Sequence, residues 1–194
     1  TPGYESDRNR LFVYDFATNT KKELITNFDY NVEAVEWTAD SKMLYFLSPI
    51  NATHQVFSFD MNPKSKNAFK QLTFDQAGYN ELTVSGMGKT TSVVTSRVDM
   101  TMPSELYAIN IVSGAATRIT KVTDPVWGGV KKSNVVKRMV KTTDGKEELV
   151  WVVYPPDFNP AKKYPTLLFC QGGPQSVVSQ SFSYRWNFSL MAAN

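Results

Sequence analysis

Hydrophobic and polar residues alternate in short runs through the first 120 positions, which is the period of a β-strand with one buried face. Three of these runs end in Asp or Asn and lead through a polar turn into a second run, which ends in Leu or Ile before Thr. The hairpins predicted from them cover residues 11–26, 56–73 and 106–120. Their first strands start at residues 11, 56 and 106, so successive copies lie 45 and then 50 residues apart.

Two further strand pairs lie between these hairpins. The first pairs residues 32–37 with 43–47, and the second pairs residues 81–84 with 91–95. Four short strands per repeat, linked by turns that carry Asp, Gly and Ser, are typical of the blades of a β-propeller. An irregular β-sandwich is the alternative. Because two or three blades do not close a ring, we expect a piece of a larger parent protein.

The repeat stops after Pro125, where a different pattern begins. Val135–Thr143 and Lys146–Tyr154 are alternating runs on either side of Asp144-Gly145, a dipeptide that predicts a tight hairpin. Residues 149–154 are continuously apolar, and we therefore expect both faces of this strand to be covered.

The last thirty residues predict a buried strand, a loop and a helix. Tyr164–Cys170 is the apolar strand, and Ser179 or Ser181 is a candidate cap for the helix. Three apolar residues that recur every fourth position form one helical stripe: Phe182, Trp186 and Leu190. A hairpin, a buried strand, a loop and a helix in this order are typical of the start of an α/β sheet.

Composition excludes several classes of protein. Hydrophobic residues make up 42% and charged residues 20%, and the formal charge of +3 is too small and dispersed for a nucleic-acid binder. The single cysteine, Cys170, excludes a disulfide framework. No run approaches the ~20 apolar residues that span a bilayer. We expect neither a cofactor nor a bound metal.

The loop after the predicted buried strand reads "FCQGGPQSVVSQ" from Phe169 to Gln180. Loops at the carboxyl ends of strands are where α/β proteins place their sites, and glycine lets a reacting group approach the backbone N–H groups. The loop does not fit the glycine patterns that hold phosphates. It is therefore either a structural turn or half of an oxyanion hole, which α/β-hydrolases build after their third strand.

The sequence "KTTDGKEELVWVVYPPDFNPAKKYPTLLFCQGGPQ", after the repeats, resembles the prolyl oligopeptidase family of serine peptidases. More narrowly, it is similar to the bacterial dipeptidyl peptidase 5 group, in which "YCQGGPQ", "SQ" and an "RWN" segment recur. The resemblance implies a mainly β chain: C-terminal propeller blades over residues 1–126, then the first strands and first helix of an α/β-hydrolase domain over 127–194.

The family removes dipeptides from the N-termini of oligopeptides, so the implied partner is an oligopeptide, with homo-oligomerisation left open and neither nucleic acid nor membrane expected. Its bacterial members are mostly exported to the periplasm. In this resemblance, the residues of the family that lie next to the oxyanion correspond to Gln171 and Gly172. Several relatives have Tyr or His where this chain has Gln171.

The sequence lacks the other parts of a serine peptidase site. It contains no G-x-S-x-G elbow, and its one histidine, His54, is expected in a loop between blades. Glu33 and Glu36 are interpreted as ordinary polar residues of a strand. We therefore expect this polypeptide to be inactive without further chain. A propeller that binds proteins without catalysis is the alternative function.

Overall fold

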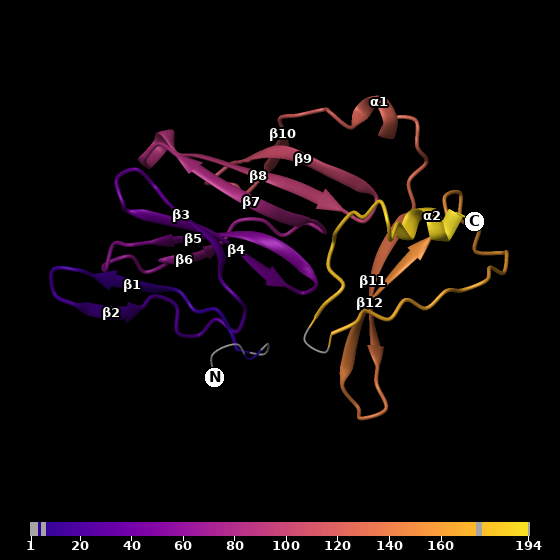
Figure 1. The fold of residues 1–194 in the computed structure, drawn as a ribbon, viewed down its shortest axis with the longest axis horizontal. Coiled ribbons are helices and arrows are strands. Elements are labelled where there is room, and N and C mark those ends of the chain that lie inside the picture. Colours follow the sequence, from indigo (N-terminus) through magenta and orange to yellow (C-terminus); the bar gives the residue numbers. More distant parts are fainter. Residues whose placement is uncertain (1–3, 5–6, 174–175, 194) are drawn as a thin grey trace.

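The computed structural model describes residue 4 and residues 7–173 and 176–193. The chain is mainly β, with few helices, as predicted. Figure 1 shows the strands of one large sheet, a two-stranded hairpin near the N-terminus and a second two-stranded hairpin on the C-terminal side.

Two four-stranded antiparallel meanders follow each other along the chain. The first consists of β3 (Glu33–Trp37), β4 (Met43–Ile50), β5 (Thr53–Asp60) and β6 (Phe69–Gln71). The second consists of β7 (Gly78–Ser85), β8 (Ser92–Asp99), β9 (Met102–Ile109) and β10 (Ala116–Arg118), with the 3₁₀ turn Gly88–Thr90 between β7 and β8. Each predicted pair of strands in this region is therefore confirmed.

The hairpin of β1 (Phe12–Asp15) and β2 (Thr20–Glu23) forms a two-stranded sheet of its own. The two meanders are linked by one parallel backbone pair, His54 with Gly78. Within the described residues the strands form an open arrangement, and no sheet closes on itself.

An Asp or Asn begins the turn of each repeated hairpin. The side-chain oxygen of Asp15 accepts hydrogen bonds from the N–H groups of Ala17 (2.8 Å) and Thr18 (3.1 Å). Asp60 and Asn110 make the same bonds to residues two or three positions further on. The repeated strand ending is therefore an Asx turn, which reverses the chain with its own side chain.

Strand β4 is buried on both faces. Tyr45 and Leu47 lie in a core cluster with residues of the second meander, while Leu44 and Phe46 lie in a cluster with Leu11 on the other side. Because successive side chains of a strand point to opposite faces, this alternation makes the first meander a middle layer.

The hairpin predicted around Asp144-Gly145 is confirmed as β11 (Asn134–Lys141) and β12 (Glu147–Tyr154), with Gly145 at φ +82°. The expectation that both faces of residues 149–154 are covered is wrong. These residues are half-buried, because the hairpin is a two-stranded sheet by itself.

The predicted buried strand Tyr164–Cys170 does not form. The segment is irregular, Leu167 is 77% and Leu168 is 86% exposed, and Cys170 is exposed as well. A strand needs a neighbour for its backbone hydrogen bonds, and none of the described strands pairs with this segment.

The predicted C-terminal helix is shorter than its apolar stripe. Only α2 (Phe188–Ala193) is helical. The hydroxyl of Ser183 accepts hydrogen bonds from the N–H groups of Arg185 and Trp186, which gives the backbone a turn in place of a helix. The side chain of Asn187, not Ser179 or Ser181, accepts the N–H of Leu190 at 2.9 Å and caps α2.

The short helix α1 (Asp124–Trp127) was not predicted from the sequence. Pro125 in its first turn is a signal from which the helix could have been predicted. Proline is favoured there because it lacks the N–H group that the start of a helix leaves unpaired.

Candidate functional site

The candidate site is the glycine loop, which we define as residues 170–173. Gln171 and Gly172 are both exposed, and a Cβ added to Gly172 would meet no atom within 4 Å. Within the described residues, neither of their N–H groups donates a hydrogen bond. The backbone donors of this loop are therefore open to an incoming group.

Aromatic packing positions the chain on the N-terminal side of the glycine loop. The ring of Phe169 lies 5.0 Å from that of Phe188 at the start of α2, and 6.0 Å from that of Trp186. On the other side of the loop, the hydroxyl of Ser176 donates to the carbonyl oxygen of Gly172.

The chain after the glycine loop passes between the second meander and the hairpin of β11 and β12 (Figure 1). The indole N–H of Trp151, in β12, donates to the carbonyl oxygen of Val178 at 2.8 Å. Two residues later Gln180 contacts both meanders, since its N–H donates to Ala52 at 3.2 Å and its Oε1 accepts from the N–H of Met100 at 3.3 Å. We name residues 176–182 the docking segment.

Trp127, at the end of helix α1, contacts both the second meander and the docking segment. The indole N–H of Trp127 donates to the carbonyl oxygen of Thr101 at 3.1 Å, in the turn between β8 and β9. The ring of Trp127 also meets that of Phe182 edge to face, with centroids 5.2 Å apart. The contacts of Trp127, Trp151 and Gln180 could not be predicted from the sequence, since their partners lie 26 or more residues away.

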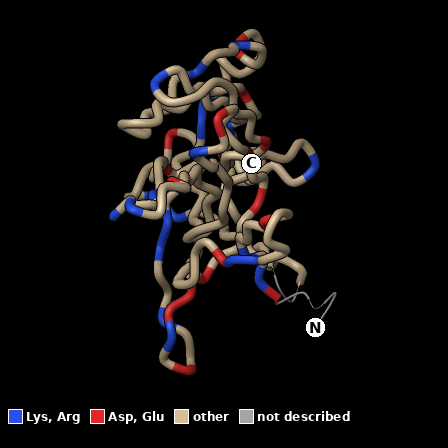
Figure 2. Tube along the Cα trace, turned by 90° about the vertical axis from the view of Figure 1, so that its left-hand side faces the viewer, with Lys and Arg blue, Asp and Glu red and all other residues tan. Residues whose placement is uncertain are grey.

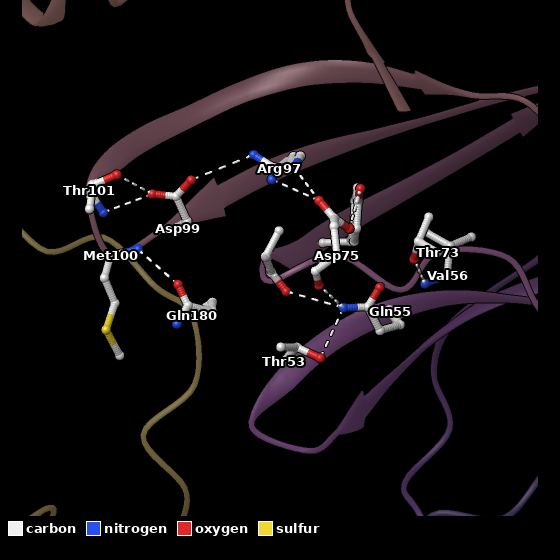
Figure 3. A network of polar contacts seen from close by, with 12 residues as sticks. Thr53, Gln55, Val56, Thr73, Asp75, Arg97, Asp99, Met100, Thr101 and Gln180 are labelled. Atoms are coloured by element: carbon white, nitrogen blue, oxygen red, sulfur yellow. Dashed lines mark hydrogen bonds and ion pairs between the residues drawn. The ribbon is translucent and has the colours of Figure 1, made fainter. Parts of the chain in front are cut away.

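A polar network lies beside the docking segment (Figure 3). Arg97 donates to Asp75 through Nε (2.9 Å) and Nη2 (2.7 Å), and the Tyr79 hydroxyl donates to the same carboxylate at 2.9 Å. Burial raises the pKa of Tyr79, and the negative charge of Asp75 raises it further. The pKa of Arg97 is also raised: burial opposes this rise, but the hydrogen bond and the charge of Asp75 outweigh it.

A cavity of about 470 Å³ opens beside this network, between Leu72, Arg97, Tyr107 and Gly114. The charge of Arg97 is already paired with Asp75 and Asp99, so the described residues that line the cavity offer no unpaired cation to a ligand. Along the whole trace, basic and acidic residues are interspersed (Figure 2).

His54 lies in strand β5 and not in a loop between strands, which corrects the expectation. Its Nε2 is 4.0 Å from Oε2 of Glu33, at the start of β3. No contact joins His54 to the glycine loop in the described part of the chain. Glu36 is an exposed residue of β3, as interpreted from the sequence.

The described residues offer neither a metal site nor a membrane-spanning helix. They contain no group of three or more His, Cys, Asp or Glu side chains arranged to hold a metal ion. None of their helices is long and apolar enough to cross a membrane.

Solved structures show which proteins contain a similar fold. The acylaminoacyl peptidase of Pyrococcus horikoshii matches 98% of this chain with a TM-score of 0.76 and 17% identity, over 27% of its own length. Dipeptidyl peptidase 4 of Porphyromonas gingivalis matches 93% of the chain with a TM-score of 0.64 and 17% identity, over 26% of its length. The fold is thus that of one part of these peptidases.

Sequence comparison finds relatives of higher identity than these structures. Dipeptidyl-peptidase 5 of Porphyromonas gingivalis is 40% identical over 98% of this chain, and that of Porphyromonas endodontalis is 40% identical over 99%. The chain spans 27% of the length of each of these relatives. No family model matches the chain. Over the part of these relatives that it spans, the chain is similar in sequence to dipeptidyl-peptidase 5, which confirms the resemblance that its motifs predicted.

Proposed function

We propose that this chain is part of a serine-type exopeptidase that releases dipeptides from the N-termini of oligopeptides. The observation that carries the proposal is the 40% identity to two proteins named dipeptidyl-peptidase 5 over nearly the whole chain. The peptide specificity, and an export to the periplasm, are inferred from this relationship.

We propose further that residues 1–126 are late blades of a β-propeller and that residues 127–194 begin an α/β-hydrolase domain. Two successive four-stranded meanders support the first part, because four antiparallel strands are the unit of a propeller blade. The end of the repeat before α1 supports the boundary. In the hydrolase domain, Tyr164–Cys170 would pair with strands that the described residues do not supply.

The glycine loop has a defined chemical role in this proposal. When a serine attacks the substrate carbonyl, negative charge develops on the carbonyl oxygen, and N–H donors stabilise it. The open N–H groups of Gln171 and Gly172 are the donors that we assign to this charge. Loss of one such donor typically costs about 3–4 kcal/mol of transition-state stabilisation.

Gly172→Val in the full-length protein tests this role. A β-branched side chain next to the donors should lower kcat for a dipeptidyl anilide by about 100-fold or more, since the oxyanion loses access to them. Gly129→Val is the matched control, because a Cβ at Gly129 also meets no atom within 4 Å. An unchanged kcat in Gly172→Val, with the control intact, would leave the glycine loop a structural turn.

The sequence has no G-x-S-x-G elbow, so we propose that the nucleophile, acid and base are supplied by chain outside these 194 residues. The purified 194-residue polypeptide should then release no amine from a dipeptidyl anilide that the full-length protein cleaves. If neither form cleaves dipeptidyl substrates, the alternative of a protein-binding propeller is favoured.

A further inference from the structure

Gln180 is one of the most deeply buried polar residues of the described chain. The residue is 2% exposed, although the segment around it has no regular secondary structure. It contacts Ala52 and Met100, which lie 128 and 80 positions away in the sequence. Burial of this degree in an irregular segment means that tertiary contacts alone hold Gln180 in place.

The first contact is with the turn between β4 and β5. Asn51 and Ala52 both have positive φ, at +50° and +58°, as a two-residue hairpin requires. The carbonyl oxygen of Ala52 accepts the backbone N–H of Gln180 at 3.2 Å. Gln180 therefore docks on the first meander through a tight turn with little freedom to move.

The second contact is a close approach of two backbones. A Cβ added to Gly78 would lie 2.3 Å from the carbonyl oxygen of Gln180 and 3.3 Å from the side chain of Val98. Gly78 is also the residue through which β7 pairs with His54 of the first meander. The absence of a side chain at Gly78 lets Gln180 reach the junction of the two meanders.

The third contact fixes the side-chain amide. Oε1 of Gln180 accepts the N–H of Met100, in the turn between β8 and β9, at 3.3 Å (Figure 3). The opposite amide orientation would point an N–H group at another N–H group. In the observed orientation Nε2 is buried without a hydrogen-bond partner among the described residues. Because an unpaired buried donor is unfavourable, the contacts of Gln180 must outweigh it.

We propose that Gln180 is the positioning residue that sets the glycine loop relative to the two meanders. Gln180 follows Gly173 by seven residues, so the glycine loop stays within about 25 Å of this anchor. The contact between Trp151 and Val178 restricts the intervening chain further. The inference rests on the proposed function in one respect: the loop must carry oxyanion donors for its position to matter to catalysis.

Two substitutions disturb the anchor from opposite sides. Gln180→Met keeps a side chain of similar size and removes the acceptor of the Met100 N–H. Gly78→Ala leaves Gln180 intact but places a methyl group against its carbonyl oxygen. Gln71→Met and Gly129→Ala are the matched controls. The side-chain amide of Gln71 donates to the carbonyl oxygen of Thr73, two residues away, and a Cβ at Gly129 would meet no atom within 4 Å.

The position of the loop is measured by electron–electron distance spectroscopy on the full-length protein. One spin label is attached to Cys170 and another to Lys89→Cys, an exposed turn of the second meander, with any other cysteines replaced. We expect Gln180→Met and Gly78→Ala to shift or broaden the distance distribution, while both controls leave it unchanged. If one of these two variants does not fold, the distance distribution of the other tests the proposal. An unchanged distribution in a folded Gln180→Met or Gly78→Ala variant would overturn the proposal.

Kinetics of the unlabelled variants distinguish the effect of Gln180 on the position of the glycine loop from the effect of that position on catalysis. A misplaced loop should lower kcat for a dipeptidyl anilide by about 10- to 100-fold with a smaller change in KM. A purely structural role would lower the melting temperature and leave kcat per folded molecule unchanged. If the label distance changes but kcat does not, the anchor is supported and the assignment of oxyanion donors to the loop fails instead.

Discussion

Arg118 and Glu105 form an ion pair across the hairpin of β9 and β10, with Nη2 of Arg118 2.9 Å from Oε1 of Glu105. The Glu105 residue is only 5% exposed. Its carboxylate also accepts hydrogen bonds from the hydroxyl of Thr120 and from the N–H (2.7 Å) and hydroxyl (2.6 Å) of Thr123. One buried carboxylate therefore joins the second meander to the residue that precedes α1.

Stability should depend on pH through Glu105. Burial raises the pKa of this carboxyl, but the hydrogen bonds from Thr120, Thr123 and Arg118 outweigh burial and hold it well below the usual value of 4.5. Since the unfolded chain binds the proton first, the contribution of Glu105 is complete above about pH 4.5 and decreases as the pH falls further. Urea unfolding between pH 3 and 7 should show this loss.

Glu105→Gln is expected to lower the free energy of unfolding at pH 7 by about 1–3 kcal/mol and to flatten its dependence on acid pH. Glu148→Gln, at an exposed position of β12, serves as the control and should change neither. Equal acid sensitivity in Glu105→Gln and the unsubstituted protein would contradict the assignment.

Gly114→Ala should destabilise the second meander. Gly114 has φ +75°, and an added Cβ would lie 1.8 Å from the carbonyl oxygen of Leu72, so the turn and the neighbouring chain must separate. We expect a loss of about 2–3 kcal/mol in urea unfolding. Gly88→Ala has a positive φ of +53° but open space around the Cβ, and should therefore cost less. Equal losses would mean that the close approach to Leu72 is unimportant.

Tyr79→Phe tests the network around Asp75. The Tyr79 hydroxyl donates to Asp75 in the core, and its removal should cost about 1 kcal/mol at pH 7. Because burial and the charge of Asp75 raise the pKa of Tyr79 above its usual 10.0, the phenol stabilises the fold below that pH. The stability of the protein should fall more steeply above pH 10 than that of Tyr79→Phe, as measured by thermal unfolding in alkaline buffers.

Phe57→Ala should remove the centre of an aromatic stack. Phe57 is 1% exposed, and its ring lies nearly parallel to those of Phe46 (5.4 Å between centroids) and Phe69 (5.5 Å). The cavity left by the ring should cost about 3–5 kcal/mol in urea unfolding, and Phe57→Leu clearly less. Similar losses for both variants would indicate that ring stacking, and not the filled volume, is what stabilises this cluster.

The predictions from sequence succeeded where the information is local. Alternation with a period of two is a property of consecutive residues, and Asp15, Asp60 and Asn110 bond to N–H groups two or three positions away. The paired strands of both meanders could therefore be predicted without knowing the fold. The motif around Gln171 and Gly172 likewise indicated the similarity to dipeptidyl-peptidase 5 before any geometry was known.

The predictions failed where the outcome depends on a partner elsewhere in the chain. Tyr164–Cys170 has the composition of a buried strand, but backbone hydrogen bonds between strands require a partner, and none of the described strands pairs with it. The apolar stripe from Phe182 to Leu190 likewise did not reveal that the Ser183 hydroxyl would take the N–H groups of Arg185 and Trp186.

The sequence by itself determined the strands of the two meanders, their turns and the similarity to dipeptidyl-peptidase 5, because each depends on neighbouring residues or on a short motif. Only the tertiary structure decided that Gln180 is an anchor. Its partners, Ala52 and Met100, are separated from it by 128 and 80 positions, and burial between them arises only when the two meanders and the docking segment pack together.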